Sequence, residues 1–135
     1  MKTFLNLVIV IFSLSTSCNN QELNQKIHIN YKAQTRGFLY KISLINDVLE
    51  IENNGTLKSK TLNSEQISEI KKLVSNLNFN EIESNISKDD LAVDKAIEGV
   101  FVVKINSKTR LLNLNHNSLP VKIEELFSQL ERNLE

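Results

Sequence analysis

Tryptophan is absent from this chain of 135 residues, and cysteine, proline and glycine are so scarce that they exclude some classes of protein. A single cysteine cannot form a disulfide within the chain. The two histidines are far apart in sequence and have no cysteine partner, so the chain does not supply the ligands of a structural zinc site. One proline and three glycines exclude collagen-like and low-complexity segments. We therefore expect an ordinary globular domain that holds neither a disulfide nor a metal.

An excess of charge of one sign is also absent, because 16 basic residues balance 16 acidic residues. Binding to nucleic acid or to an anionic lipid surface requires clustered basic charge. No such cluster is visible along the sequence, so neither nucleic acid nor an anionic lipid surface is an expected partner. No cofactor-binding motif occurs either, so no cofactor is expected.

The first 17 residues have the order of a secretory signal. Lys2 precedes an apolar run over residues 4–14, and three small residues then lead to Cys18. The apolar run is shorter than the stretch of about 20 residues that a membrane-spanning helix needs. We expect residues 1–17 to be a signal peptide that is removed by cleavage before Cys18. An uncleaved anchor and an ordinary secretion signal followed by a free thiol are the alternatives.

The segment Leu14-Ser15-Thr16-Ser17-Cys18 resembles the lipobox of bacterial lipoproteins, with Ser15 where the usual pattern has an aliphatic residue. The resemblance implies that the Cys18 thiol carries a diacylglyceryl group and that signal peptidase II cuts before it. Each buried methylene of a lipid contributes about 0.8 kcal/mol to membrane binding, so two or three acyl chains, for example palmitoyl chains, hold a protein stably on the membrane. The implied location is the bacterial cell envelope. The expected membrane is the outer membrane, with the domain outside the cytoplasm.

The chain therefore divides into three parts. Residues 1–17 are the signal peptide, residues 18–25 are the lipidated cysteine with a short tether, and residues 26–135 form a single domain. Within that domain, apolar and polar residues alternate along several runs, and the pairs 46–47 and 54–55 between them favour two-residue turns. The predicted strands cover residues 26–32, 37–44, 48–52, 56–62, 100–105 and 110–114.

Two segments have the apolar spacing of amphipathic helices. The first is expected to be capped by Asn63 or Ser64, and Asn63 with Gln66 has the form of a capping box; the second ends near Leu134. Ser118 is expected to cap the second helix, with Pro120 in its first turn. The fold class that follows is α+β, a mainly antiparallel sheet of about six strands with the two helices packed on one face. Residues 100–105 are apolar on both faces, which predicts a central strand covered on part of its second face.

Four residues are weak candidates for an interaction site. Asp90 and Asp94 belong to the densest acidic stretch, whose pattern is not that of a calcium loop and is typical of a solvated loop. Arg36 lies between the first two strands, where it can bind a carboxylate or a phosphate or simply be an exposed turn residue. His116 lies between a strand and a helix, close to Ser118, but without the motif of a nucleophile, and we expect it to be a loop or capping residue.

The region after the tether is similar to small uncharacterised bacterial lipoproteins. The similarity rests on Tyr31, followed by Arg36-Gly37-Phe38, and on His116 four residues before Pro120. Such proteins often have an acidic residue before the histidine and a glycine after it, where this chain has asparagine. The resemblance implies no activity.

Three hypotheses of function remain open from the sequence. The leading one is a non-enzymatic envelope lipoprotein that serves as a binding or interaction module, with a protein partner in the envelope. The second is an immunity or inhibitor protein that blocks a toxin acting on the envelope. The third is a hydrolase that uses His116 with an acidic side chain among Asp89, Asp90 and Asp94.

Overall fold

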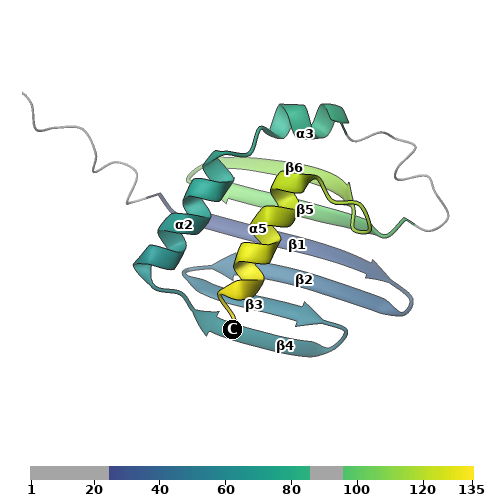
Figure 1. The fold of residues 1–135 in the computed structure, drawn as a ribbon, viewed down its shortest axis with the longest axis horizontal. Helices are drawn as coiled ribbons and strands as arrows, with labels where there is room; N and C mark the ends of the chain where they lie inside the picture. Colours follow the sequence, from purple (N-terminus) through teal and green to yellow (C-terminus); the bar gives the residue numbers. More distant parts are fainter. Residues whose placement is uncertain (1–24, 86–95) are drawn as a thin grey trace, which may run out of the picture.

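The structure of the chain is a computed structural model, and it describes residues 25–85 and 96–135. Figure 1 shows an open sheet with helices on one side of it. The elements in chain order are β1 (Ile27–Thr35), β2 (Phe38–Ile45), β3 (Val48–Asn53), β4 (Thr56–Thr61), α2 (Ser64–Ser75), α3 (Phe79–Asn85), β5 (Glu98–Ile105), β6 (Lys108–Asn115) and α5 (Val121–Arg132).

The six strands form one sheet in the order β4-β3-β2-β1-β5-β6, and every neighbouring pair is antiparallel. The first strand, β1, therefore lies inside the sheet, between β2 and β5, while β4 and β6 form the edges (Figure 1). The α+β class and the antiparallel sheet predicted from the sequence are confirmed. The short helix α3 lies where the sequence allows a helical turn, around residues 80–84.

The hairpin turns are set by residues that tolerate a positive φ. Asn46 and Asp47 have φ values of 50° and 65°, and Asn54 and Gly55 have values of 48° and 87°. Two successive left-handed residues give the twist that joins neighbouring strands of an antiparallel sheet. These two predicted turns are confirmed, and they fix the register of β2, β3 and β4.

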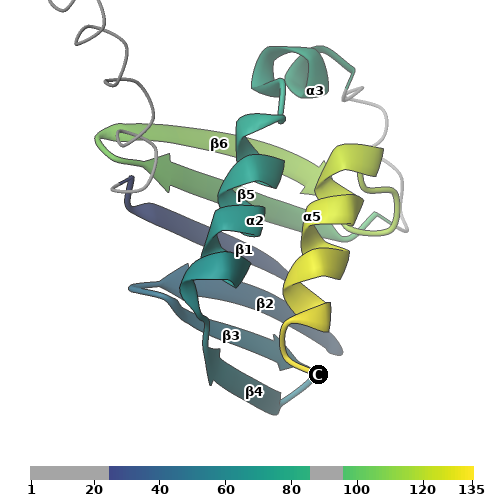
Figure 2. The same ribbon diagram turned by 60° about the vertical axis from the view of Figure 1, so that its left-hand side comes forward.

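Helices α2 and α5 lie side by side across the strands and cover one face of the sheet (Figures 1 and 2). The core between the two layers contains the alternate, inward-facing residues of the strands together with the apolar stripes of the helices. Its largest fully buried side chains are those of Tyr31, Phe101, Ile29, Ile42, Leu44, Leu49, Ile70, Leu114, Ile123, Leu126, Leu130 and Val74.

The two helices begin differently. Asn63 caps α2 as predicted: its side chain accepts from the Gln66 amide at 2.9 Å, and the Gln66 side chain accepts from the Asn63 amide at 3.0 Å. The prediction of Ser118 as the cap of the second helix is wrong. The N-cap of α5 is Pro120, without a side-chain cap, and the Ser118 amide is used in a turn that bonds to the Asn115 carbonyl. Proline fits this position because it has no amide hydrogen to satisfy and a fixed φ.

The opposite face of the sheet is not covered by any helix or strand of residues 25–85 and 96–135 (Figure 2). Residues 100–105 form an inner strand as predicted, because β5 lies between β1 and β6. The predicted cover on its second face is not provided by any helix or strand of the described residues. β5 lies next to the edge strand β6, and Val100 on the uncovered face is 38% exposed. We call this uncovered side the open face.

No helix within the described ranges is both long enough and apolar enough to cross a membrane.

Candidate functional site

The clearest grouping of aromatic and polar side chains lies at one end of the sheet, around His116. This residue follows the last residue of β6, and its amide donates to the Ile97 carbonyl at 2.8 Å. The bond extends the pairing of β5 with β6 by one step beyond Glu98 and Asn115. This hydrogen bond therefore holds the backbone of His116 at the end of the sheet, just before the loop to α5 begins.

The imidazole of His116 packs against three aromatic rings and is half-buried. Its Nδ1 atom is hydrogen-bonded to the Tyr31 hydroxyl at 2.8 Å. Its ring centroid lies 5.0 Å from that of Phe38, 5.2 Å from that of Tyr40 and 5.8 Å from that of Tyr31. The prediction of a loop residue is correct for the backbone, whereas the side chain is a member of a packed aromatic cluster and caps no helix.

A second hydrogen bond connects this cluster to α5. The Tyr40 hydroxyl donates to Oε1 of Glu131, in the last turn of the helix. Tyr31 also contacts the helix, because its ring centroid lies 4.6 Å from that of Phe127. Two tyrosines on neighbouring strands thus connect His116, at the end of β6, with one face of α5.

Gly99 provides the space that Tyr31 occupies. A Cβ atom built on Gly99 would lie 2.7 Å from two carbons of the Tyr31 ring, and would also overlap the hydroxyl. Carbon atoms in contact are normally about 3.5–4.0 Å apart. Gly99 of β5 lies opposite Ala33 of β1 in the strand register. The hydrogen bond between Tyr31 and His116 therefore depends on glycine at this position.

The ionisation of these groups follows from their surroundings. Burial lowers the pKa of His116 below its ordinary value of 6.5, and the carboxylate of Glu131 opposes this shift. Burial raises the pKa of Tyr31 above its ordinary value. Burial also raises the pKa of Tyr40, and its hydrogen bond to the Glu131 carboxylate adds to this effect. At pH 7 the cluster thus consists of an uncharged imidazole and two protonated hydroxyls.

The cluster lacks the pairing of a nucleophile with a base. In residues 25–85 and 96–135, the one side chain that is hydrogen-bonded to His116 is Tyr31, and no serine, threonine or cysteine contacts its ring nitrogens. The acidic member, Glu131, is bonded to Tyr40 rather than to His116. This arrangement orients and packs the imidazole.

The other candidate residues do not join this cluster. Arg36 is exposed in the turn between β1 and β2. Asp89, Asp90 and Asp94 lie outside the described residues, as does Cys18, so the structure does not describe an acidic partner for His116 from that stretch. Where residues are described, no three acidic, histidine or cysteine side chains are grouped so that they could hold a metal ion.

Sequence reasoning missed Gly99 and Glu131 as members of this cluster. Tyr31 and Tyr40 are buried in the core, as aromatic residues on one side of a strand commonly are. Glu131 is an exposed residue of an amphipathic helix, and nothing along the chain marks it as a partner of Tyr40. The pairing follows only from the position of α5 over β2.

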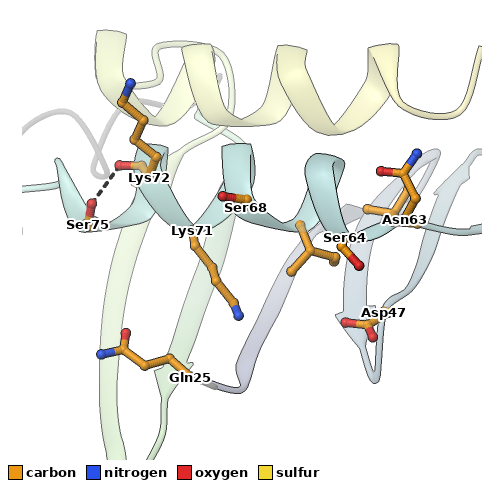
Figure 3. A pocket seen from close by; sticks show the side chains of 10 residues that line it. Gln25, Asp47, Asn63, Ser64, Ser68, Lys71, Lys72 and Ser75 are labelled. Carbon is orange, nitrogen blue, oxygen red and sulfur yellow. Dashed lines mark hydrogen bonds between the residues drawn. The ribbon is translucent and has the colours of Figure 1, made fainter. Parts of the chain in front are cut away.

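A second feature is a groove of about 750 Å³ along the outer side of α2. Figure 3 shows the side chain of Lys71 extending from the helix toward Gln25, which precedes β1, and toward Asp47 in the turn between β2 and β3. The groove is lined by Gln25, Asp47, Leu62, Asn63, Ser64, Ile67, Ser68, Lys71, Lys72 and Ser75. It lies at the opposite end of the strands from His116, because β1 starts beside it and ends near Gly99.

Comparisons of this chain with protein families, with curated proteins and with solved structures find no match.

Proposed function

We propose that the chain is the precursor of a lipid-anchored envelope protein whose domain acts as a non-enzymatic interaction module. The signal-like residues 1–17 and the single cysteine at position 18 support the anchor. The packing of His116 among aromatic rings, with no nucleophile bonded to it in the described ranges, supports a role without chemistry.

The observation that carries the proposal is the apolar character of the open face. Five large apolar side chains are exposed in the described residues, and four of them point to this side: Ile45 at 43%, Leu57 at 60%, Val100 at 38% and Leu111 at 56%. Ile45, Val100 and Leu111 alternate along their strands with buried residues, which places them on the open face. Leu57 lies opposite Glu52, which itself alternates with buried residues of β3. Val100 and Leu111 lie on the neighbouring strands β5 and β6, and adjoining exposed apolar side chains commonly mark a contact surface.

The side chains around these residues favour one kind of partner. Val102 lies opposite Leu111 in the register of β5 with β6, and Lys32 of β1 lies opposite Val100. Of the charges nearby, Lys41 is already paired with Glu52 at 3.3 Å, whereas Lys32 has no ion pair within the described part of the chain. A protein surface with apolar side chains beside a carboxylate would complement this area.

A crosslinking experiment in intact cells tests the interaction. A photoreactive amino acid in place of Leu111 should give one discrete crosslinked product, because this position lies within the proposed contact area. The same amino acid in place of Lys122, on α5, serves as the matched control and should not give that product. Adding Val100→Asp, which places a charge on the open face without touching the core, should abolish the product. Identical products from both positions, or a product that survives Val100→Asp, would contradict the proposal.

The anchor is tested separately. Mass spectrometry of the protein purified from membranes should show lipid mass on an amino-terminal Cys18, and Cys18→Ser should release the protein from the membrane fraction. An unmodified thiol on a protein cleaved elsewhere would exclude the anchor and leave the crosslinking result unaffected.

A further inference from the structure

Basic side chains gather at the end of the sheet where the chain enters the domain. Lys26 directly precedes β1, and Lys104 lies near the end of β5, opposite His28 in the strand register. The Lys26 carbonyl accepts a hydrogen bond from the Asn106 amide at 3.1 Å, which holds the start of β1 against the turn between β5 and β6. Lys71 reaches the same region from α2 (Figure 3).

Three adjoining depressions of the surface share these residues. The groove along α2 shares Gln25, Asp47 and Lys71 with a second depression, and the second shares Lys26 and His28 with a third, which Lys104 also lines. Their lining contains four lysines, Lys26, Lys71, Lys72 and Lys104, but only one acidic residue, Asp47. None of these lysines forms an ion pair with a side chain in the described ranges.

The cluster exists only in the folded chain. Lys26, Lys71 and Lys104 are far apart in sequence, which is why the sequence predicted no basic cluster and no anionic lipid surface as a partner. The antiparallel order of the sheet brings the start of β1 and the end of β5 together, and α2 crosses the strands beside them. This end of the domain therefore carries a group of basic side chains that the order of residues along the chain does not reveal.

We propose that this end of the domain, defined by Lys26, Lys71 and Lys104, rests on a bilayer surface of anionic phospholipid headgroups. The inference rests on the lipid anchor proposed above, since Cys18 precedes Gln25 by seven residues. Seven residues span at most about 25 Å when fully extended. An anchor at Cys18 would therefore keep the lysines close to the headgroups, where attraction operates over a Debye length of about 8 Å at physiological salt.

This placement has a geometric consequence for the rest of the domain. The strands run away from the end that carries the lysines, so the His116 cluster lies at the far end, away from the bilayer. The open face stands at the side, where a protein partner can reach it. The attraction between the lysines and the anionic headgroups thus orients the domain on the bilayer, while the lipid on Cys18 supplies most of the free energy of membrane binding.

Vesicle binding by the unlipidated chain tests the proposal independently of the anchor. The chain from residue 18 onward, carrying Cys18→Ser, retains every helix and strand described. It should sediment with vesicles of phosphatidylcholine and phosphatidylglycerol at a ratio of 7:3 at low salt. It should remain in solution with pure phosphatidylcholine vesicles and in salt of about 0.5 M, where the Debye length falls to roughly 4 Å.

Two triple variants with the same net charge decide where the binding surface lies. The variant Lys26→Gln/Lys71→Gln/Lys104→Gln should bind on the order of 100-fold more weakly, since each basic residue near an anionic surface contributes about fivefold. The matched variant Arg36→Gln/Lys58→Gln/Lys122→Gln removes three charges elsewhere and should bind like the parent chain. Circular dichroism confirms that both variants are folded.

Two results would overturn the proposal. One is equal weakening by both triple variants, which would mean that only net charge matters. The other is a parent chain that does not bind the anionic vesicles at low salt. Because no lipid is attached in this assay, either result leaves the test of the Cys18 anchor by mass spectrometry intact, and a failure of the anchor leaves this assay intact.

Discussion

Replacement of Gly99 with alanine is expected to destabilise the domain, although this substitution usually stabilises a strand. Glycine inside a strand is less favourable than alanine by roughly 0.5–1 kcal/mol, because glycine loses more backbone freedom on folding. At Gly99 the added methyl group would lie 2.7 Å from two carbons of the Tyr31 ring. Tyr31 is fully buried and cannot move away without disturbing its contacts with His116 and Phe127.

The expected size of the effect follows from the cost of overpacking a core. Extra methyl groups in a well-packed interior cost about 1–3 kcal/mol. In a domain of roughly this size each 1 kcal/mol lowers the melting temperature by about 4 °C. The backbone advantage of alanine offsets about 0.5–1 kcal/mol of this cost, so thermal unfolding followed by circular dichroism should show Gly99→Ala melting up to about 10 °C below the parent. Gly37→Ala is the control, since no atom lies within 4 Å of the position of its Cβ, and it should have little effect.

A double variant tests whether Tyr31 is the cause. Tyr31→Phe removes the hydroxyl, which is the atom nearest to the new methyl group, at the cost of its hydrogen bond to His116. The loss of stability in Gly99→Ala/Tyr31→Phe should be smaller than the sum of the two single losses, which is the sign of direct contact. A Gly99→Ala variant as stable as the parent, or strict additivity in the double variant, would refute the reasoning.

Three further outcomes are expected from the same region and from the helix ends. Burial lowers the pKa of His116 in the folded state, so the unfolded chain binds the proton first and the free energy of unfolding should fall as the pH drops below about 6.5. Urea unfolding from pH 8 to pH 5 measures this fall, and His116→Gln should remove the part of it that comes from the imidazole. Glu131→Gln removes the carboxylate that opposes the shift, so the proton NMR titration midpoint of His116 should fall further, whereas the remote Glu135→Gln should leave it in place. Gln66→Ala removes half of the capping box and the 3.4 Å hydrogen bond from Gln66 Nε2 to Asn133 Oδ1, and it should cost about 1 kcal/mol in urea unfolding, against no loss for the exposed Gln34→Ala.

The parts of the fold that the sequence predicts correctly are those set by local chemistry. The turns at Asn46-Asp47 and Asn54-Gly55 require residues that accept a positive φ, and the cap at Asn63 requires a side chain that accepts a backbone hydrogen bond. Alternation along the strands also predicts which side chains are buried, because one face of the sheet carries the core. Each of these features depends on residues that are neighbours in the chain.

The parts that the sequence predicts poorly depend on partners that are distant in the chain. The pattern of residues 100–105 correctly predicts an inner strand, but apolar residues on both of its faces do not reveal whether a second layer covers it. The role of Gly99 follows only from its position opposite the Tyr31 ring. The prediction of a helix cap at Ser118 fails because the loop after His116 uses that residue in a turn, which leaves Pro120 to start the helix. The basic cluster is likewise a property of strand order rather than of composition.

The position of β1 inside the sheet has a consequence for folding. Its pairing with β2 requires a turn of only two residues, whereas its other neighbour, β5, begins at Glu98. The strands β1 to β4 are therefore expected to assemble first, since local hairpins close at a lower entropic cost than long loops. Until β5 arrives, β1 presents a bare edge of nine residues with unpaired amides and carbonyls. A chain interrupted before Glu98 would keep this edge permanently available to other chains, and aggregation through β1 is the failure expected of such a fragment.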